Sequence, residues 1–319
     1  MSALLQVQKL SVAYRQRQAS VPVLDGVSFS LQAGETLGLV GESGSGKSQI
    51  ALALMGLLPP QAVVTGAVQF EGRELLSLPA AERRRLRGAR MGLIFQDPMT
   101  CLHPQLTIGL QLAEVLECHQ GASRSAALAE AARLLDAVRL PEPQRRLKQY
   151  PHELSGGQRQ RVMIAMMLLA KPVLLIADEP TTALDVTVQA EILKLLASLQ
   201  RERGLGLLLI SHDLGVMAER ADALLVLYAG RVAEQGSAAA VLAQPLHPYT
   251  QALLRCRPTL DTPLGVPLPT IAGSPIRLAA VAQGCAFAAR CPRAEALCRQ
   301  QQPVLRRGGE HGLSACHFS

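Results

Sequence analysis

Residues 41–48 read GESGSGKS and fit the phosphate-loop pattern G-x4-G-K-S/T, between an apolar stretch and a helix-like stretch. The glycines let backbone N–H groups point at phosphate oxygens, and the helix N-terminus adds a favourable dipole. Lys47 would contact the β- and γ-phosphates, and Ser48 would ligate Mg²⁺. A glycine turn beside a stray lysine is the simpler alternative, and the strand–helix context disfavours it. The predicted ATP- and magnesium-binding residues here are Gly41, Ser43, Gly44, Ser45, Gly46, Lys47, Ser48 and Gln49.

Two acidic residues follow an apolar stretch at residues 174–177. Asp178, at the tip of the predicted strand, can hold Mg²⁺ through its water shell. Glu179 would then point at the γ-phosphate, where a base for an attacking water is needed. An acidic pair after a strand is by itself more often a helix cap than a catalyst. The phosphate loop in the same chain favours the catalytic interpretation.

Residues 154–158 read LSGGQ and open a predicted helix at 159–170. Ser155 is a good N-cap, so an ordinary helix start is the alternative. The two glycines nevertheless indicate a second anion-binding helix terminus, more than 100 residues after the phosphate loop. The chain therefore carries two predicted phosphate-recognising helix termini.

Residues 4–240 resemble the ATP-binding cassette (ABC) ATPases, and LSGGQ matches the signature of that family letter for letter. Gln96 resembles the loop glutamine that senses Mg²⁺ and the membrane subunit, so it is also a predicted Mg²⁺ ligand. His212 resembles the switch histidine that contacts the γ-phosphate, and Tyr14 the ring that stacks on adenine. The resemblance implies a signature that contacts ATP in trans: Leu154, Ser155, Gly156, Gly157 and Gln158. It also implies a dimer-interface loop: Ala183, Leu184 and Asp185.

The resemblance implies a mechanism in which two such subunits pair head to tail. Each ATP then lies between one subunit's phosphate loop and the other subunit's signature. Closure on ATP drives a membrane partner, and hydrolysis reopens the pair. The implied catalytic residues are Glu179, His212 and Gln96.

Residues 247–254, HPYTQALL, resemble the C-terminal marker of the peptide and nickel importer ATPases, and DPMT at 97–100 also resembles that group. The chain departs from the group at Cys101 and His103, where small polar residues are more common, and no metal site is inferred there. The overall resemblance is strongest to the dipeptide-type ATPase subunit. It implies a second homologous ATPase, two permeases and an extracytoplasmic binding protein as partners. It also implies ATP hydrolysis coupled to peptide import, at the cytoplasmic face of the inner membrane.

Two other functions remain as alternatives. A nickel or other small-solute importer would use the same kind of ATPase, because the binding protein and permeases select the cargo. A soluble ABC ATPase acting on nucleic acid or ribosomes belongs to a different class. Its repair type needs a longer heptad insert than residues 105–149 supply, and its translation type carries two cassettes. We therefore expect no nucleic-acid partner.

Four of the seven cysteines fall within the last 35 residues: Cys285, Cys291, Cys298 and Cys316. Four thiolates can bind Zn²⁺ or a [4Fe–4S] cluster, and the spacing lacks the C-x2-C knuckles usual for zinc. The dipeptide-type ATPases carry a similar tail, and that resemblance implies a [4Fe–4S] cluster. Zinc and unliganded thiols remain alternatives. A bound cluster would staple a tail that shows little apolar periodicity.

Apolar spacing predicts the elements that position these motifs. Strands are expected at 5–14, 27–31, 36–40, 91–96, 173–177 and 206–210, hairpins at 63–72 and 223–234, and helices at 49–58, 82–90 and 186–203. This βαβ rhythm indicates an α/β fold with a mainly parallel sheet, interrupted by a helical insert at 105–149. The resemblance refines it to a RecA-like P-loop ATPase core with an antiparallel β subdomain and a helical subdomain at about 97–165. The predicted domains are 1–245 and a small Cys-rich C-terminal extension at 246–319.

Composition sets the outer limits. The 319 residues are 49% apolar and 18% charged, which is enough apolar material for a sizeable core. The net charge of +7, from 27 Arg and 5 Lys against 25 acids, suits a phosphate ligand, an anionic surface or nucleic acid. Aromatic residues make up 3% and tryptophan is absent, which disfavours stacking platforms for single-stranded nucleic acid. Apolar runs are shorter than a membrane span and no signal peptide is evident, so we expect a soluble, intracellular chain.

Overall fold

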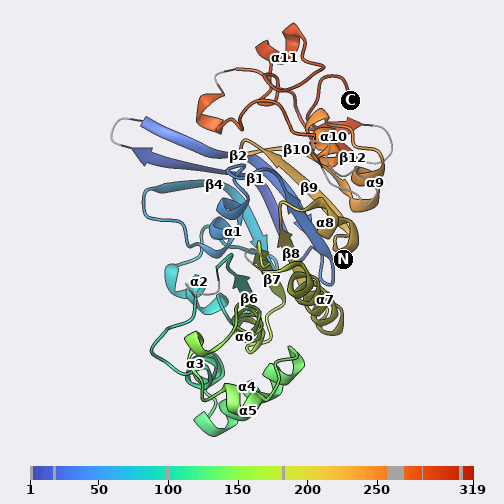
Figure 1. Cartoon of the computed structure of the whole chain (residues 1–319). Coiled ribbons are helices and arrows are strands. Elements are labelled where there is room, and N and C mark those ends of the chain that lie inside the picture. The colour runs from blue at the N-terminus through green and yellow to red at the C-terminus, as the bar shows by residue number, and fades with distance from the viewer. Residues whose placement is uncertain are drawn as a thin grey trace. The chain divides into compact units, whose positions relative to one another are not determined.

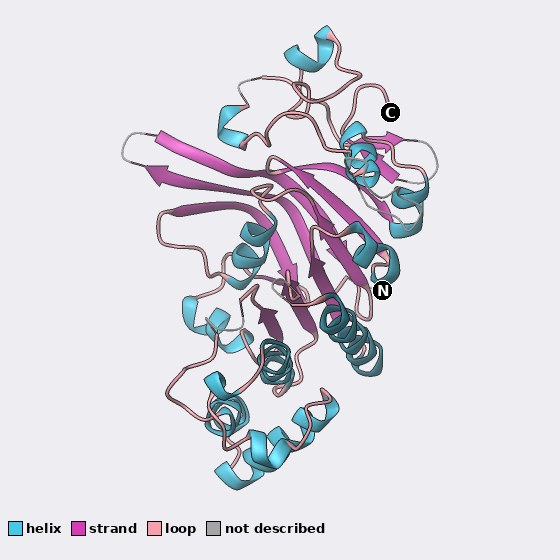
Figure 2. Cartoon of the chain, viewed as in Figure 1, coloured by secondary structure: helices cyan, strands magenta, loops and turns pink. Residues whose placement is uncertain are grey.

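The computed structural model describes residues 3–16, 19–97, 101–181, 184–256, 269–281, 283–308 and 312–319 (Figure 1). The chain forms two compact units. The first contains Met1–Gln32, Thr36–Leu76 and Leu209–Ser319, and the second contains Ala33–Glu35 and Ser77–Leu208. Helices and strands occur in both units (Figure 2). The α/β class predicted from the βαβ rhythm is therefore confirmed.

The first unit contains an antiparallel sheet in the order β2-β1-β4-β5: β1 Leu5–Gln16, β2 Ala19–Leu31, β4 Ala62–Phe70 and β5 Arg73–Glu74. In β1 the buried positions are Leu5 and Val7, then Leu10 and Val12, so the alternation changes parity in mid-strand. A register shift occurs there, and Lys9 has a positive φ of 49°. The β-bulge at Lys9 returns apolar side chains to the buried face.

Two predicted strand boundaries in this sheet are wrong. β2 begins at Ala19 rather than at residue 27 because its N-terminal half pairs with β1, from Gln16↔Ala19 to Val12↔Leu24. The predicted hairpin at 63–72 is a single strand, β4, whose hairpin partner is the short β5. In both strands, pairing with β1 outweighs the local preference for a turn. In β2 the residues that favour a turn are Pro22 and Gly26.

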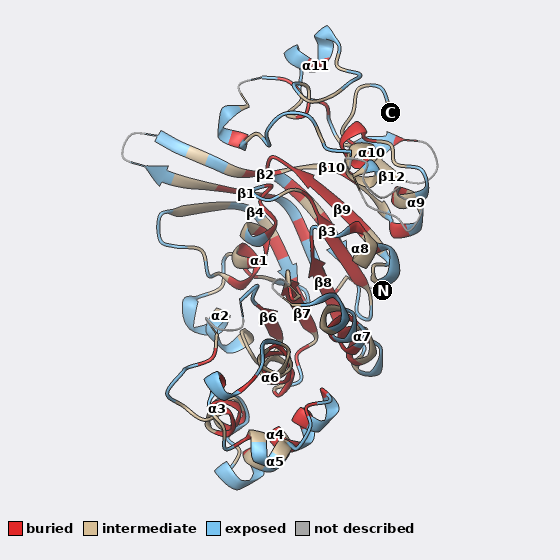
Figure 3. Cartoon of the chain, in the orientation of Figure 1, coloured by how far each residue is buried: buried red, intermediate tan, exposed pale blue. Residues whose placement is uncertain are grey.

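The first unit also carries a mixed sheet in the order β11-β12-β10-β9-β3: β3 Thr36–Val40, β9 Ala223–Tyr228, β10 Arg231–Ser237, β11 Arg306–Gly308 and β12 Gly312–Ser314. β3 and β9 are parallel and almost completely buried (Figure 3). The described helices of this unit are α1 Lys47–Met55, α8 Leu214–Arg220, α9 Ala238–Ala243, α10 Pro248–Arg255, η3 Leu278–Ala280 and α11 Ala296–Gln300. This sheet positions the phosphate loop, which follows β3.

The second unit is mainly helical around the parallel pair β6 Met91–Ile94 and β7 Leu174–Asp178. Its described helices are α2 Ala80–Leu86, α3 Ile108–Gln120, α4 Arg124–Ala137, α5 Pro143–Arg146, η2 Pro151–Glu153, α6 Gly156–Leu168 and α7 Val186–Arg203. α3, α4 and α5 occupy the stretch predicted to be a helical insert. β8, Gly206–Ile210, contains the boundary between the two units.

Among the described residues, no helix is long and apolar enough to cross a membrane. The predicted domain boundaries, at residue 245 and at about 97 and 165, stay predictions.

Candidate functional site

The phosphate loop joins β3 to α1 and requires glycine at two of its positions. A Cβ added to Gly41 would lie 2.2 Å from the backbone oxygen of Leu227, and one added to Gly46 would lie 2.6 Å from Leu24 Cδ2. Gly46 also has a φ of 105°, which L side chains rarely adopt. The loop is therefore shaped by close approach of neighbouring strands, as well as by its own sequence.

Lys47 lies across this loop. Its side chain is buried, and its Nζ donates to the carbonyl oxygens of Gly41 at 2.8 Å and Glu42 at 3.0 Å. The hydroxyl of Ser45 is buried without a hydrogen-bond partner among the described residues. A buried unpaired hydroxyl is costly unless a ligand satisfies it. The loop therefore fits a bound phosphate, with a cation and an unused hydroxyl already in place.

Two further predicted residues lie in the first unit with the loop. The hydroxyl of Tyr14, in β1, donates to Gln49 in α1, and burial raises the pKa of Tyr14. His212 follows β8 and is exposed, between Ser211, whose N–H donates to Leu39 of β3, and Asp213, the N-cap of α8. Both therefore belong to segments bound to β3 or α1, the elements on either side of the loop.

The second unit brings together two predicted catalytic residues from positions 83 apart. Gln96 Nε2, just after β6, donates to Glu179 Oε2, just after β7, at 3.1 Å. β6 and β7 are parallel neighbours, so their C-terminal ends place both side chains at one edge. Glu179 has a positive φ of 46°, which is uncommon for a residue with a side chain. Such strain occurs often at functional sites, and Asp178 precedes it as the last residue of β7.

The signature segment forms the start of α6. The Ser155 hydroxyl accepts from the Gln158 N–H at 3.4 Å, and Gln158 Oε1 accepts from the Ser155 N–H at 3.0 Å, which is a capping box. The helix begins at Gly156, so the predicted start at residue 159 is three residues late. A Cβ at Gly157 would lie 2.7 Å from Val188 Cγ1 of α7. The small size of Gly157 therefore lets α6 and α7 approach closely.

The predicted dimer-interface loop is only partly within the described residues. Asp185 is the N-cap of α7 and accepts from the Val188 N–H at 3.0 Å, and Leu184 precedes it. Ala183 lies outside the described residues. Each site role assigned to these residues stays a prediction.

The four C-terminal cysteines share the walls of one cavity of about 20 Å³, and all four are free thiols: Cys285, Cys291, Cys298 and Cys316. Burial raises the pKa of Cys285 and of Cys291. Among the described residues, no three His, Cys, Asp or Glu side chains are placed closely enough to hold a metal ion. The donor set has the chemistry of a thiolate metal centre, but its present spacing does not hold one. The predicted [4Fe–4S] cluster stays a prediction.

The sequence did not predict the residues that hold Glu42, the second residue of the phosphate loop. Its N–H donates to the Tyr249 hydroxyl at 2.8 Å, and its carboxylate accepts from Arg290. Tyr249 belongs to the HPYTQALL marker, which had served only to indicate a family. Arg290 follows a cysteine by five positions and carries no motif of its own.

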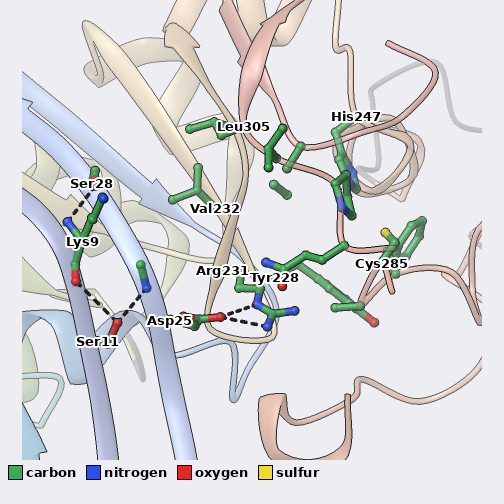
Figure 4. Close-up of a pocket in the computed structure, with 18 residues that line it drawn as sticks. Lys9, Ser11, Asp25, Ser28, Tyr228, Arg231, Val232, His247, Cys285 and Leu305 are labelled. Atoms are coloured by element: carbon green, nitrogen blue, oxygen red, sulfur yellow. Dashed lines mark hydrogen bonds and ion pairs between the residues drawn. The ribbon is translucent and has the colours of Figure 1, made fainter. Parts of the chain in front are cut away.

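A larger cavity, of about 760 Å³, lies in the first unit (Figure 4). Its walls come from β1, β2, the β9–β10 hairpin and the C-terminal segment, and they include Tyr228, His247 and Cys285. Arg231 of β10 is directed at Asp25 of β2 in the close-up, and the two form an ion pair at 2.8 Å.

Solved structures of ATP-binding cassettes share this fold. Residues 24–182 match the family described as "ABC transporter". A dimeric, post-hydrolysis structure of the ATP-binding cassette MJ0796 bound to ADP and Pi aligns with a TM-score of 0.66 and 28% identity. The alignment covers 73% of this chain and 98% of that one. Fold and loop together therefore define an ABC ATPase of the α/β class with mixed sheets.

Relatives narrow the class further. Residues 233–298 match the family described as "Oligopeptide/dipeptide transporter, C-terminal region". The oligopeptide transport ATP-binding protein OppD of Salmonella typhimurium is 51% identical over 95% of this chain and 90% of its own length. The dipeptide transport ATP-binding protein DppD of Escherichia coli is 45% identical over 99% and 97%. The chain belongs to the family of oligopeptide and dipeptide transport ATP-binding proteins.

The predicted resemblance to this family is confirmed. The identities do not favour the dipeptide type, because the oligopeptide relative from Salmonella is the more similar of the two.

Proposed function

We propose that this chain is the ATPase subunit of an ABC importer that moves di- or oligopeptides across the cytoplasmic membrane. The reaction is ATP + H₂O → ADP + phosphate, coupled to transport. The observation that carries the proposal is the 51% identity with the oligopeptide transport ATP-binding protein over nearly the whole chain. The intact phosphate loop, with Lys47 across it, agrees with this function.

The chain's own residues supply the chemistry of binding and proton transfer. Backbone N–H groups of the loop and the Lys47 ammonium bind the β- and γ-phosphates. Glu179, held by Gln96, accepts a proton from the attacking water as the water oxygen forms a bond to the γ-phosphorus and the bond to ADP breaks. His212 contacts the γ-phosphate and Tyr14 stacks on adenine. Ser48, Gln96 and Asp178 would hold Mg²⁺, which would neutralise charge on the phosphates.

The same proposal includes the assembly. Two ATPase subunits pair so that LSGGQ of one contacts the ATP of the other, and residues 183–185 meet across the pair. Two permeases and an extracytoplasmic binding protein complete the importer, with this chain peripheral at the cytoplasmic face. The cassette extends to about residue 245, with a helical part at about 97–165, and residues 246–319 form the extension. These assignments follow the family to which the chain belongs.

Glu179→Gln tests the catalytic assignment. The amide cannot accept the proton from water, so we expect ATP hydrolysis to fall about 10²–10⁴-fold while the dissociation constant for ATP changes less than about twofold. Glu191→Gln is the matched control, because Glu191 is a half-exposed acid of the same unit that pairs with Arg161. Hydrolysis is measured with the partner subunits in proteoliposomes. Wild-type rates from Glu179→Gln would overturn the assignment.

The cargo is tested in the same proteoliposomes. Peptides of two to six residues and Ni²⁺ are offered with the binding protein, and stimulation of hydrolysis is recorded for each. Stimulation by peptides supports the proposal, and stimulation by Ni²⁺ alone would replace it with a nickel importer. Recovery of nucleic acid or ribosomes instead of permeases in a pull-down would replace it with the soluble class.

We further propose that the four C-terminal cysteines hold a [4Fe–4S] cluster. This proposal is supported by the four sulfur donors that line one cavity. Anaerobically purified protein is analysed for iron and sulfide, with Cys291→Ser against Cys118→Ser as the control. Cys118 is an exposed thiol outside the cavity. One equivalent of zinc without brown absorbance would refute the cluster.

A further inference from the structure

Glu42 connects the phosphate loop to the C-terminal part of the chain. Its backbone N–H donates to Tyr249 Oη at 2.8 Å, a residue 207 positions later. Its carboxylate accepts two hydrogen bonds from Arg290, 248 positions later: Nη1 to Oε2 at 2.6 Å and Nη2 to Oε1 at 3.0 Å. Glu42, Tyr249 and Arg290 all belong to the first compact unit. This geometry is a bidentate ion pair, the form in which an Arg–carboxylate bond fixes orientation best.

The guanidinium of Arg290 has no freedom to turn away. Its side chain is 5% exposed. Besides Glu42, it donates through Nε to the carbonyl of Ala272 at 2.8 Å, through Nη2 to that of Ile271 at 3.2 Å, and through Nη1 to the Tyr228 hydroxyl at 3.3 Å. These bonds and the two to Glu42 use all five of its N–H donors. Arg290 is therefore a fixed anchor for the carboxylate.

Tyr249 is fixed equally well. It is fully buried, and its ring packs on Tyr228 and Phe287 with centroids 4.6 and 5.4 Å away. Its N–H donates to His247 Nδ1 at 3.0 Å. The hydroxyl that accepts from Glu42 is therefore held by a rigid aromatic cluster.

The backbone of Glu42 connects these two fixed side chains to the rest of the phosphate loop. Its carbonyl accepts from Lys47 Nζ at 3.0 Å and from the Ser45 N–H at 3.1 Å. One residue thus joins the C-terminal anchors to the lysine and to the centre of the loop. The carboxylate of Glu42 is also a negative charge in a loop suited to polyphosphate, and Arg290 neutralises it and holds it to one side.

We propose that Arg290 and Tyr249 are positioning residues of the ATP site, which act through Glu42 to set the conformation and charge of the phosphate loop. The inference rests on the proposed function, in that the loop binds a nucleoside triphosphate. It gives the C-terminal segment a direct part in nucleotide binding.

The test measures the dissociation constant for ATP with Mg²⁺ by calorimetry on the purified full-length chain. We expect Arg290→Ala to raise this constant about tenfold, within the range of coupling between linked sites. Arg290→Lys keeps the positive charge without the bidentate geometry. Its dissociation constant for ATP is therefore expected to lie between those of the wild type and Arg290→Ala. Arg231→Ala is the matched control: it removes another Arg–carboxylate pair of the same unit, with Asp25, that does not contact the loop. Its dissociation constant is expected to stay within about twofold of wild type.

A double-mutant cycle separates positioning from general stability. If Arg290 acts through Glu42, then Glu42→Gln combined with Arg290→Ala binds ATP no more weakly than Arg290→Ala alone. Effects of the two substitutions that multiply would show that Arg290 acts by another route. An unchanged dissociation constant in Arg290→Ala would make Arg290 purely structural and would overturn the proposal.

Tyr249→Phe provides a second measurement that leaves the buried ring in place. Loss of the hydroxyl removes the acceptor of the Glu42 N–H, and we expect a rise of about threefold in the dissociation constant, typical of one neutral hydrogen bond. If Arg290→Ala does not fold, an unchanged constant in Tyr249→Phe overturns the proposal on its own. A wild-type chain that fails to bind ATP would overturn the proposed function as well, whereas tight wild-type binding with unchanged variants overturns only the positioning role.

Discussion

His247 is a buried imidazole whose charge state depends on folding. Its side chain is enclosed, its Nδ1 accepts from the Tyr249 N–H, and burial lowers its pKa from 6.5 to about 4. Nδ1 is an acceptor in the folded chain, so protonation at this nitrogen would break the bond to Tyr249. Between pH 6.5 and 4 the unfolded chain therefore binds a proton here that the folded chain does not.

Stability is consequently expected to decrease as the pH falls below 6.5. From pH 7.5 to pH 5 the His247 contribution amounts to about 2 kcal/mol. His247→Asn, whose side-chain oxygen can still accept from the Tyr249 N–H, should lose that part of the decrease. Denaturant unfolding of both proteins at the two pH values measures it. Glu234 accepts a hydrogen bond from the His247 backbone N–H, and its pKa is raised by burial. Its own contribution to the pH dependence is separate, because both chains contain Glu234. An equal decrease in both would show that His247 is not the titrating group.

Residues whose chemistry requires a fixed local spacing could be predicted from the sequence. The phosphate loop, the Asp178–Glu179 pair and the signature are of this kind, because phosphate and magnesium restrict which residue types can stand side by side. Gln96 and Glu179 lie 83 positions apart, and only the family resemblance predicted that they belong to the same site. Arg290 could not be found in this way, because a single arginine 248 positions from Glu42 produces no periodicity or motif.

At the scale of elements, helix α7 was predicted with its observed bounds and strand β2 was not. α7 has an apolar face at helical spacing, an Asp185 cap and Gly204 as its C-cap, so local signals agree. β2 contains Pro22 and Gly26, which interrupt a strand pattern locally. Its pairing with β1 includes Ala13↔Pro22, and the Gly26 N–H donates to the Ser11 hydroxyl at 2.9 Å. Tertiary pairing decides such a strand, and the sequence alone does not show it.

The contact between α6 and α7 makes a prediction about stability. Alanine at Gly157 would place its Cβ 2.7 Å from Val188 Cγ1, and a β-branched side chain has little freedom to move. Overpacking costs about 2 kcal/mol, more than the gain of up to about 1 kcal/mol from replacing glycine in a helix. We therefore expect Gly157→Ala to lower the free energy of unfolding and the further change Val188→Ala to recover most of the loss.

Gly156→Ala is the control for this change. Within the described part of the chain, its Cβ would meet only Leu184 Cδ2, at 3.6 Å, which is ordinary van der Waals contact. Thermal unfolding of the three variants gives the comparison. A Gly157→Ala chain as stable as Gly156→Ala would contradict the close packing of the two helices.

At the largest scale, the C-terminal strands β11 and β12 complete the mixed sheet of the first unit, which also contains β3. β12 pairs with β10 through Glu234↔Ser314, Gln235↔Leu313 and Gly236↔Gly312, and β11 pairs with β12. A chain that stops at Leu305 would leave the backbone groups of β10 unpaired at an edge, and such edges promote association. We expect a lower thermal midpoint and aggregates on size exclusion.

A chain that stops at Phe318 serves as the control, since it keeps both strands. Equal midpoints for the two shortened chains would show that β11 and β12 do not contribute to stability.

The attachment of the phosphate loop to late parts of the chain also has a consequence for synthesis. The strand that leads into the loop binds Asp222 through the Thr36 N–H at 2.7 Å, and the Ser45 carbonyl accepts from the Gly230 N–H at 2.9 Å. Tyr249 and Arg290 emerge from the ribosome later still. Contacts of such long sequence separation form slowly, so a nascent chain carries the complete GESGSGKS sequence long before the loop has its partners. The phosphate loop is therefore expected to reach its final conformation late in synthesis, and chains that end before Tyr249 and Arg290 are expected to bind ATP more weakly.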